Sequence, residues 1–477
     1  MRILITIVLL QTFLFNANAQ NNYVQFTGDV DTRVADIAES GFLTTAAKLT
    51  AYSVELNGGN KDLGLVKVNY SNVLQMSSQF HYNNMDLYAK KVLPGGEYIL
   101  AERVDHTARH FKRPVIIKIN SSTGTLVYAV ELPNVPFPYV YTSILDFVQD
   151  NTSAGLRILC NGNGNSTNCI FEVLFNTTTF QCTFLRYDPQ QAMNEIQFLG
   201  YIKHYHNSED MLGELSFYGT AIMSSGNRKG FIYFKDYNVP YVFQTYQFSN
   251  SQLIGFMVNG TSSGGSIPNI ITMAMTSHLD PSNICIQQKV GLSTLVWRKF
   301  YHTQDLNAFY FGYGRGGHGV KGYSTSNTID YFIGTHENLF ATPKVTVLRY
   351  EASNGTIQPS PQFNFTNTDN KTSWPNFTDD PSQPYYFVVD RYNHANGFKM
   401  ADANSTDDNT ACTDPISFVE VTGDLDEQNV VMDITDYPTP VASTTISLIR
   451  TEITTNIIPE CNTEQRTPPV VFKRRDK

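Results

Sequence analysis

The sequence has 477 residues, enough for one large hydrophobic core or two smaller ones. Charged residues make up 16% of it, and the formal net charge is −9. This acidic balance lacks the basic footprint of nucleic-acid-binding proteins, so we expect no nucleic-acid partner.

The first 19 residues have the pattern of a secretory signal peptide. Arg2 precedes a mostly apolar run over residues 3–15, and Ala17-Asn18-Ala19 matches the A-x-A cleavage pattern. The run is shorter than the roughly 20 apolar residues that span a membrane, and no later stretch approaches that length. We therefore predict cleavage after residue 19, a secreted, extracellular protein and no membrane span.

Between residues 46 and 365, apolar residues alternate with polar ones, and Gly, Asn, Asp and Ser interrupt the alternation, which is typical of strands and turns. A strand–turn–strand unit recurs there at intervals of 51 to 61 residues. Its copies begin at residues 65, 116, 170, 231, 284 and 345. A unit of this length with three or four strands has the size of a β-propeller blade.

We predict an all-β fold in which residues 20–365 form a β-propeller of six or seven blades, with a β-rich C-terminal extension. Each small sheet would bury its faces against its neighbours. Tandem β-sandwiches are the alternative, although their hairpins usually recur every 8–12 residues or so, without a longer period.

The sequence "GGEYILAERV", followed by "VIIKINSSTGTLVYAVEL", carries a resemblance to known proteins. It resembles the β-propeller repeats of secreted bacterial and protist proteins, a group that includes quinoprotein-type blades. In these blades a strand, a K-[IV]-[ND] step, a TG turn and an outer strand recur. The resemblance spans about residues 46–365 and is close in the unit that ends at Leu132, with an echo at Asn354-Gly355-Thr356. It implies a fold but no activity, because such propellers have unrelated functions.

An even number of cysteines follows the predicted signal peptide, which favours disulfides in an oxidising compartment. The cysteines are Cys160, Cys169, Cys182, Cys285, Cys412 and Cys461. Six cysteines allow about 15 connectivities, which the sequence leaves open. In one of them, suggested by spacing, the first two close a hairpin, the last two link the ends of the C-terminal region, and the middle two form a third pair. Zinc binding is the alternative, but the sequence has no C-x-x-C pair.

N-x-[ST] sequons are frequent and become plausible glycosylation sites once a signal peptide is predicted. They begin at Asn69, Asn120, Asn151, Asn165, Asn176, Asn259, Asn354, Asn364, Asn370, Asn376 and Asn404. We expect these residues to lie on the surface.

Residues 366–384 are polar, contain Pro and carry two of the sequons, which predicts a glycosylated linker or loop. Strand-like runs resume over residues 385–477, as a last blade or a small β domain. Within them, "STTISLIRTEITTNIIP" is rich in β-branched residues. We predict that it pairs within its own domain; alternatively, it adds to a neighbouring molecule and mediates self-assembly.

A glycine-rich segment, "FGYGRGGHGVKGY" at residues 311–323, matches G-x-G-x-x-G, but the motif binds dinucleotides only between a strand and a helix. Here a turn and a strand follow, so we predict a loop at the rim of the propeller. It is a candidate binding site for an acidic sugar or a carboxylate, and a plain flexible loop is the alternative. The candidate ligand-binding side chains are Tyr313, Arg315, His318 and Lys321.

His204 and His206 would share one face of a strand and could begin a metal site, but no third ligand is evident. We therefore predict no metal and no cofactor. Acids that could take part in glycan cleavage lie near predicted strands, and nothing in the sequence distinguishes them. They are Asp146, Glu214, Asp330 and Glu337.

Taken together, these features predict a secreted, glycosylated protein that binds other extracellular proteins or glycans, or assembles outside the cell, without catalysis. The alternative is a glycan-acting hydrolase or lyase with its site at the propeller funnel. The sequence has neither a G-x-S-x-G elbow nor an H-E-x-x-H motif to indicate such chemistry.

Overall fold

A computed structural model describes most of residues 20–459. The described ranges are 20–26, 30–40, 47–56, 60–69, 73–82, 85–93, 95–105, 111–150, 155–164, 167–189, 193–201, 204–205, 216–223, 225–236, 239–261, 270–280, 282–303, 308–311, 320–321, 329–337, 344–358, 360–363, 385–389, 397–404 and 413–459. Strands dominate these ranges and form repeated antiparallel sheets, so the prediction of an all-β fold is confirmed. Within them, no helix has the length and apolarity needed to cross a membrane. The predicted signal peptide and the predicted linker at residues 366–384 lie outside the described residues.

The described strands form seven sheets, numbered here in chain order. Sheet 1 contains β2 (Val30–Ser40), β3 (Ala47–Leu56), β4 (Lys61–Asn69), β5 (Leu74–His81) and β36 (Ile449–Glu452). Sheet 2 contains β6 (Asp86–Val92), β7 (Tyr98–Asp105), β8 (Phe111–Ile119), β9 (Leu126–Glu131) and β35 (Thr444–Thr445). Sheet 3 contains β10 (Val140–Asp150), β11 (Gly155–Gly164), β12 (Thr167–Asn176), β13 (Gln181–Pro189) and β34 (Met432–Ala442).

The remaining four sheets follow the same plan with small variations. Sheet 4 contains β14 (Met193–Tyr201), β16 (Phe217–Met223), β17 (Arg228–Asp236), β18 (Val239–Phe248) and β33 (Leu425–Val430). Sheet 5 contains β15 (His204–Tyr205), β19 (Leu253–Thr261), β20 (Ile270–Ser277), β21 (Asn283–Val290), β22 (Thr294–Thr303) and β32 (Phe418–Val421). Sheet 6 contains β23 (Ala308–Phe311), β24 (Val320–Lys321), β25 (Ile329–Glu337), β26 (Lys344–Glu351), β27 (Ile357–Gln358), β28 (Ser360–Phe363) and β31 (Thr413–Ile416). Sheet 7 contains β29 (Tyr385–Val389), β30 (Gly397–Asn404), β1 (Gln20–Phe26) and β37 (Thr455–Pro459).

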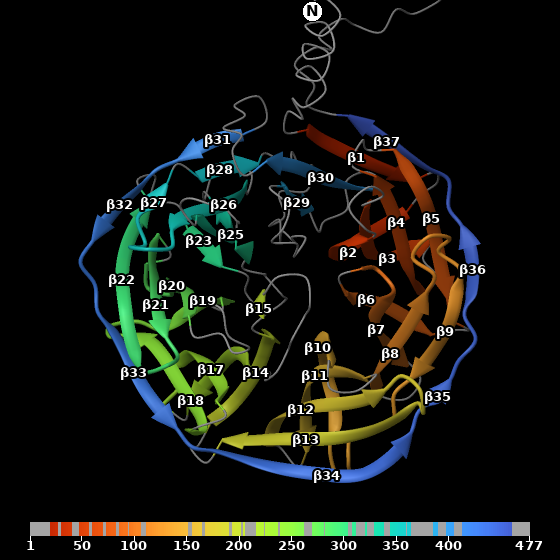
Figure 1. Ribbon diagram of the computed structural model, residues 1–477, viewed down its shortest axis with the longest axis horizontal. Helices are drawn as coiled ribbons and strands as arrows, with labels where there is room; N and C mark the ends of the chain where they lie inside the picture. The colour runs from red at the N-terminus through yellow and green to blue at the C-terminus, as the bar shows by residue number, and fades with distance from the viewer. Residues whose placement is uncertain are drawn as a thin grey trace, which may run out of the picture.

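The sheets lie side by side around a common centre (Figure 1). When the short strands β15 and β24 are left out of the count, each predicted repeat unit begins in the third strand of a different sheet, namely in β4, β8, β12, β17, β21 and β26. Sheet 7 is not formed by one repeat unit. Its strand β1 comes from the N-terminal end of the described chain and lies between β30 and β37, which come from the C-terminal part.

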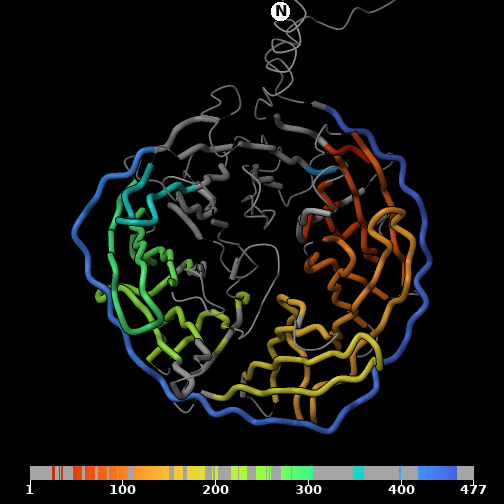
Figure 2. The backbone as a smooth tube through the Cα atoms, viewed as in Figure 1, coloured from red at the N-terminus to blue at the C-terminus, as the bar shows by residue number. Residues whose placement is uncertain are grey.

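Residues 413–459, called the belt from here on, run along the outside of the whole array (Figures 1 and 2). The belt supplies the edge strand of all seven sheets, and it visits sheets 6 to 1 in the reverse of chain order before it ends on sheet 7. Each belt strand pairs antiparallel with the strand beside it. The belt therefore occupies edges that would otherwise be open to other strands.

The hydrophobic core consists of separate clusters, each shared by two neighbouring sheets. One cluster joins Leu100 of sheet 2 to Phe171 of sheet 3, and another joins Phe231 of sheet 4 to Ile170 of sheet 3. Further clusters join sheets 1 and 2, sheets 4 and 5, sheets 5 and 6, and sheets 7 and 1. Because the middle strands of a sheet are covered on both faces, strands such as β4 are buried along nearly their whole length.

One kind of turn links the third and fourth strands in sheets 2, 3 and 6. Its last residue has a positive φ, which is 65° at Gly124, 55° at Phe180 and 76° at Gly355. The N–H of this residue donates to the carbonyl four residues earlier, at 2.7, 2.9 and 2.8 Å respectively. A side chain from the preceding sheet covers each turn: Met76, Tyr128 and Trp297, in the same order.

Replacement of Gly355 by Ala is expected to destabilise the protein by about 2–4 kcal/mol, because backbone strain at positive φ and overpacking add. A Cβ at this position would lie 2.5 Å from the ring of Trp297, whose Nε1 is held by the carbonyl of Ala352 at 2.9 Å. Gly291→Ala is the matched control, since Gly291 has φ 58° but nothing within 4 Å of an added Cβ. Denaturant unfolding should show a clearly smaller loss for the control, about 1–2 kcal/mol. Equal losses would contradict the packing argument.

Candidate functional site

The predicted ligand-binding loop and metal site fall largely outside the described residues. Tyr313, Arg315, His318 and His206 lie there, so their prediction stays untested. Lys321 lies in β24, opposite Asp330 of β25, and His204 lies in β15, opposite Gly260 of β19; the side chains of Lys321 and His204 are not described. Across the described ranges, no group of three or more His, Cys, Asp or Glu residues could hold a metal ion.

Four of the cysteines are described, and all four are buried free thiols: Cys160, Cys169, Cys182 and Cys285. The predicted Cys160–Cys169 bond is not formed, because Cys160 lies opposite Phe171 while Cys169 lies opposite Gly162. The predicted Cys182–Cys285 bond is also not formed, since these residues belong to different sheets and different clusters. Cys412 and Cys461 lie outside the described residues. Burial raises the pKa of Cys169 and of Cys182 to about 12, so both thiols stay protonated at neutral pH.

Buried acids of the described sheets connect neighbouring sheets. Asp146 of sheet 3 accepts hydrogen bonds from the N–H of Phe147 at 2.9 Å and from the N–H of Tyr201, in sheet 4, at 3.0 Å. Glu102 of sheet 2 accepts one from the N–H of Ile144, in sheet 3, at 3.1 Å. Asp146, proposed from sequence as a candidate for glycan cleavage, therefore has both carboxylate oxygens bonded to backbone N–H groups.

The side-chain positions of the other three candidates for glycan cleavage are not described. Glu214 lies outside the described residues, and Asp330 and Glu337 lie in β25 with side chains that are not described.

The belt is strongly acidic. It has five Asp and three Glu against a single Arg, a net charge of −7, while the whole chain has −9. Two Glu residues of the belt form ion pairs with basic side chains of the sheets. Glu420 in β32 pairs with Lys299 at 2.6 Å, and Glu427 in β33 pairs with both Lys289 and Arg298 of the next sheet.

In sheet 3 the belt is held by an arginine between two aromatic rings. The guanidinium carbon of Arg186 lies 4.8 Å from the centroid of the Tyr139 ring and 5.9 Å from that of Tyr437, which belongs to the belt. Arg186 also donates hydrogen bonds to both Tyr hydroxyls, at 2.9 Å for Tyr437. These cation–π contacts and hydrogen bonds fix the belt just before it leaves the ladder.

The ladder between belt and sheet 3 breaks after Tyr437. Tyr437 lies opposite Phe184 and Val441 lies opposite Cys182, so that residues 438–440 of the belt have only Thr183 across from them. Proline lacks the N–H that a ladder bond requires, and two of these three belt residues are Pro438 and Pro440.

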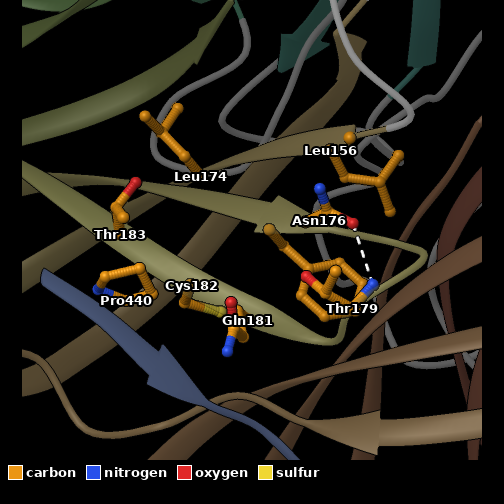
Figure 3. A pocket seen from close by; sticks show the side chains of 10 residues that line it. Leu156, Leu174, Asn176, Thr179, Gln181, Cys182, Thr183 and Pro440 are labelled. Atoms are coloured by element: carbon orange, nitrogen blue, oxygen red, sulfur yellow. Dashed lines mark hydrogen bonds between the residues drawn. The ribbon is translucent and has the colours of Figure 1, made fainter. Parts of the chain in front are cut away.

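A hollow of about 300 Å³ lies at this break (Figure 3). Its walls come from β11, from the β12–β13 turn with its flanking strands, and from the belt, so they are partly apolar and partly polar. The lining residues include Leu156, Leu174, Asn176, Gln181, Thr183 and Pro440. A mixed lining of this kind is typical of sites for small amphipathic groups.

Asn176, a predicted glycosylation site, lies in this wall. Its Oδ1 accepts the N–H groups of Thr178 and Thr179, both at 2.9 Å, while Nδ2 points away from the turn (Figure 3). The turn is held in place because Phe180 stacks on Phe175 with ring centroids 6.1 Å apart.

Four sequon asparagines lie in equivalent turns, those between the third and fourth strands of sheets 1, 2, 3 and 6. They are Asn69, Asn120, Asn176 and Asn354. In each turn Oδ1 accepts a backbone N–H, at 2.8 to 3.1 Å. Asn259 and Asn404 lie in β19 and β30 with side chains that are not described. The other sequons lie outside the described residues: Asn151, Asn165, Asn364, Asn370 and Asn376.

Sequence reasoning missed both the belt and the hollow. Two signals were present, namely the concentration of acids in residues 413–459 and the Pro-Thr-Pro break inside a strand-like run. No family model, curated protein or solved structure matches this chain. Its function therefore has to be argued from its own residues.

Proposed function

We propose that this chain is a seven-bladed β-propeller, exported and glycosylated, that acts outside the cell by binding or assembly and not by catalysis. The blades would be sheets 1 to 7. Support for the fold comes from the shared clusters, each of which lies between two neighbouring sheets, including the cluster between sheets 7 and 1. The pairing of β1 with β30 would join the two ends of the propeller.

The observation that carries the functional proposal is the recurrence of sequons in the corresponding turn of four sheets. A turn between two strands lies at the end of a sheet and can keep its residues at the surface, which an attached glycan requires. Asn120 and Asn354 are both exposed in these turns. This pattern supports the proposal that the protein matures in a glycosylating compartment and acts outside the cell.

A binding or structural role is supported by how the acids are used. Catalysis of glycan cleavage needs two carboxyl groups that can reach the substrate. The buried acids Glu102 and Asp146 instead accept backbone hydrogen bonds across sheet boundaries. The glycan-acting hydrolase or lyase therefore remains the weaker proposal, and partners are proposed to be extracellular proteins or glycans. Self-assembly through the C-terminal strands would require the belt to leave its own sheets.

Expression of the full chain in eukaryotic cells tests the proposal. The protein is expected in the medium, starting at residue 20, with a mass that falls after peptide N-glycosidase treatment, and with Asn converted to Asp at positions 120 and 354. Retention inside the cell with no glycan at any sequon would overturn the proposal.

An assay with the same secreted protein distinguishes binding or assembly from glycan cleavage. Incubated with a panel of extracellular polysaccharides, it is expected to bind at least one of them or to form assemblies that light scattering detects. The polysaccharides should keep their length. Shortened products would favour the hydrolase or lyase.

A further inference from the structure

We propose that Asn176 carries an N-glycan whose first sugar fills the hollow and braces the belt against sheet 3. This inference rests on the proposed export and glycosylation. The hollow, the sequon and the break in the ladder meet at one place, because Asn176 and Pro440 line the same space of about 300 Å³ (Figure 3).

The turn presents the amide nitrogen in a fixed direction. Since Oδ1 of Asn176 is held by two backbone N–H groups, rotation of the side-chain amide is restricted and Nδ2 stays on the side away from the turn. Glycan transfer forms a bond between Nδ2 and C1 of the sugar and breaks the bond from C1 to a lipid pyrophosphate. Nδ2 loses one proton, and the lipid pyrophosphate leaves.

The lining suits a single pyranose ring. Such a ring has apolar C–H faces and a rim of hydroxyl and amide groups. Leu174 offers apolar contact, and Gln181 and Thr183, which lie on the same face of the sheet, offer hydrogen-bonding groups. A sugar placed here would lie beside Pro440 and would fill the space that the missing ladder bonds of the belt leave open.

Asn120 provides a matched comparison within the same chain. Its Oδ1 accepts the N–H groups of Ser122 and Thr123 at 3.0 and 3.1 Å, so its turn has the same hydrogen bonds as that of Asn176. Asn120 itself is exposed, and Gly124 ends its turn where Phe180 ends the other. A glycan on Asn120 is expected to extend into solvent.

Two substitutions remove the sequons and keep both asparagines. Thr178→Ala removes the sequon of Asn176, and Ser122→Ala removes that of Asn120; both replaced side chains are exposed and their backbone N–H groups remain. Hydrogen exchange of residues 436–445 reports on the belt, since the N–H of Ser443 donates to the carbonyl of Phe180 at 2.9 Å.

In secreted protein, Thr178→Ala is expected to speed exchange in this segment about tenfold by local opening, whereas Ser122→Ala leaves it unchanged. In unglycosylated protein from bacteria, Thr178→Ala should have no effect. On the native secreted protein, endoglycosidase is expected to release the glycan of Asn120 at least several-fold faster than that of Asn176.

The outcomes separate this inference from the proposed function. Glycan on Asn120 but none on Asn176 overturns the inference alone, as does unchanged exchange in secreted Thr178→Ala. Faster exchange in bacterial Thr178→Ala as well would assign the effect to the threonine and also overturn it. Absence of glycan from every sequon overturns the proposed function with it.

Discussion

A chain that ends at residue 412 is expected to lose its monomeric folded state and to aggregate. Without the belt, an outer strand in each of the seven sheets loses its hydrogen-bonding neighbour, among them β5, β13 and β22. Open edges of this kind pair with other chains. Each ladder bond contributes only about 0.5–1.5 kcal/mol, but their sum over seven sheets is comparable with the total stability of about 5–15 kcal/mol of a typical domain.

Light scattering during a thermal ramp measures this effect. The control is a chain that ends at Pro459, which keeps the belt and lacks only residues 460–477; it should behave as the full chain does. Because the truncated chain is expected to fold poorly, it should also be refolded with a synthetic peptide of residues 413–459. Recovery of soluble one-to-one complex would locate the effect in the belt, whereas a stable, monomeric chain ending at residue 412 would contradict the prediction.

The repeat was predictable because the third strand of each sheet has the same environment throughout. β4 and β21 have a paired strand on each side and are buried almost throughout, so their apolar runs recur with the period of the sheets. Sheet 7 does not follow this period. Its strands β1 and β30 come from distant parts of the chain, so their pairing depends on the arrangement of the whole chain in space and not on local sequence.

The place of the belt and of the hollow in the fold was not predictable for the same physical reason, although their composition was visible in the sequence. Alternation within residues 413–459 indicates strands, but an edge strand with one exposed face gives no information about which sheet it joins. The hollow depends on a register between Val441 and Cys182, which are far apart in sequence. The pairings suggested by spacing for Cys160, Cys169, Cys182 and Cys285 are not formed in the structure, because spacing along the chain does not fix cross-strand register.

The belt pairs with the outer strands of the sheets, and its ion pairs also link one sheet to the next. Glu427 belongs to sheet 4 through β33, while Lys289 and Arg298 belong to sheet 5. Lys289 also reaches Gln244 of sheet 4, at 3.1 Å from Nζ to Oε1. Its ammonium group, with a side chain only 3% exposed, therefore has its charge partner on the belt of the neighbouring sheet.

Replacement of Glu427 by Gln is expected to destabilise the protein by about 3 kcal/mol, because removal of one partner leaves a buried charge uncompensated. Lys289 and Arg298 would then face each other without the carboxylate that now lies between them. The matched control is Glu420→Gln, also on the belt, whose side chain is 54% exposed against 20% for Glu427. An exposed pair such as Glu420–Lys299 contributes only about 0–1 kcal/mol.

Denaturant unfolding of both variants, with and without the second substitution Lys289→Met, isolates the interaction. Met removes the uncompensated charge and retains an apolar side chain of similar length, so it should restore part of the stability in the Glu427→Gln background and lower it in the wild type. Because buried pairs are screened by salt much less than exposed ones, the loss from Glu427→Gln should persist at high ionic strength, while any loss from Glu420→Gln should vanish. If the two Gln variants were equally stable at low salt, the belt would be held by its backbone ladder alone, and its acidic residues would act only on the outer surface.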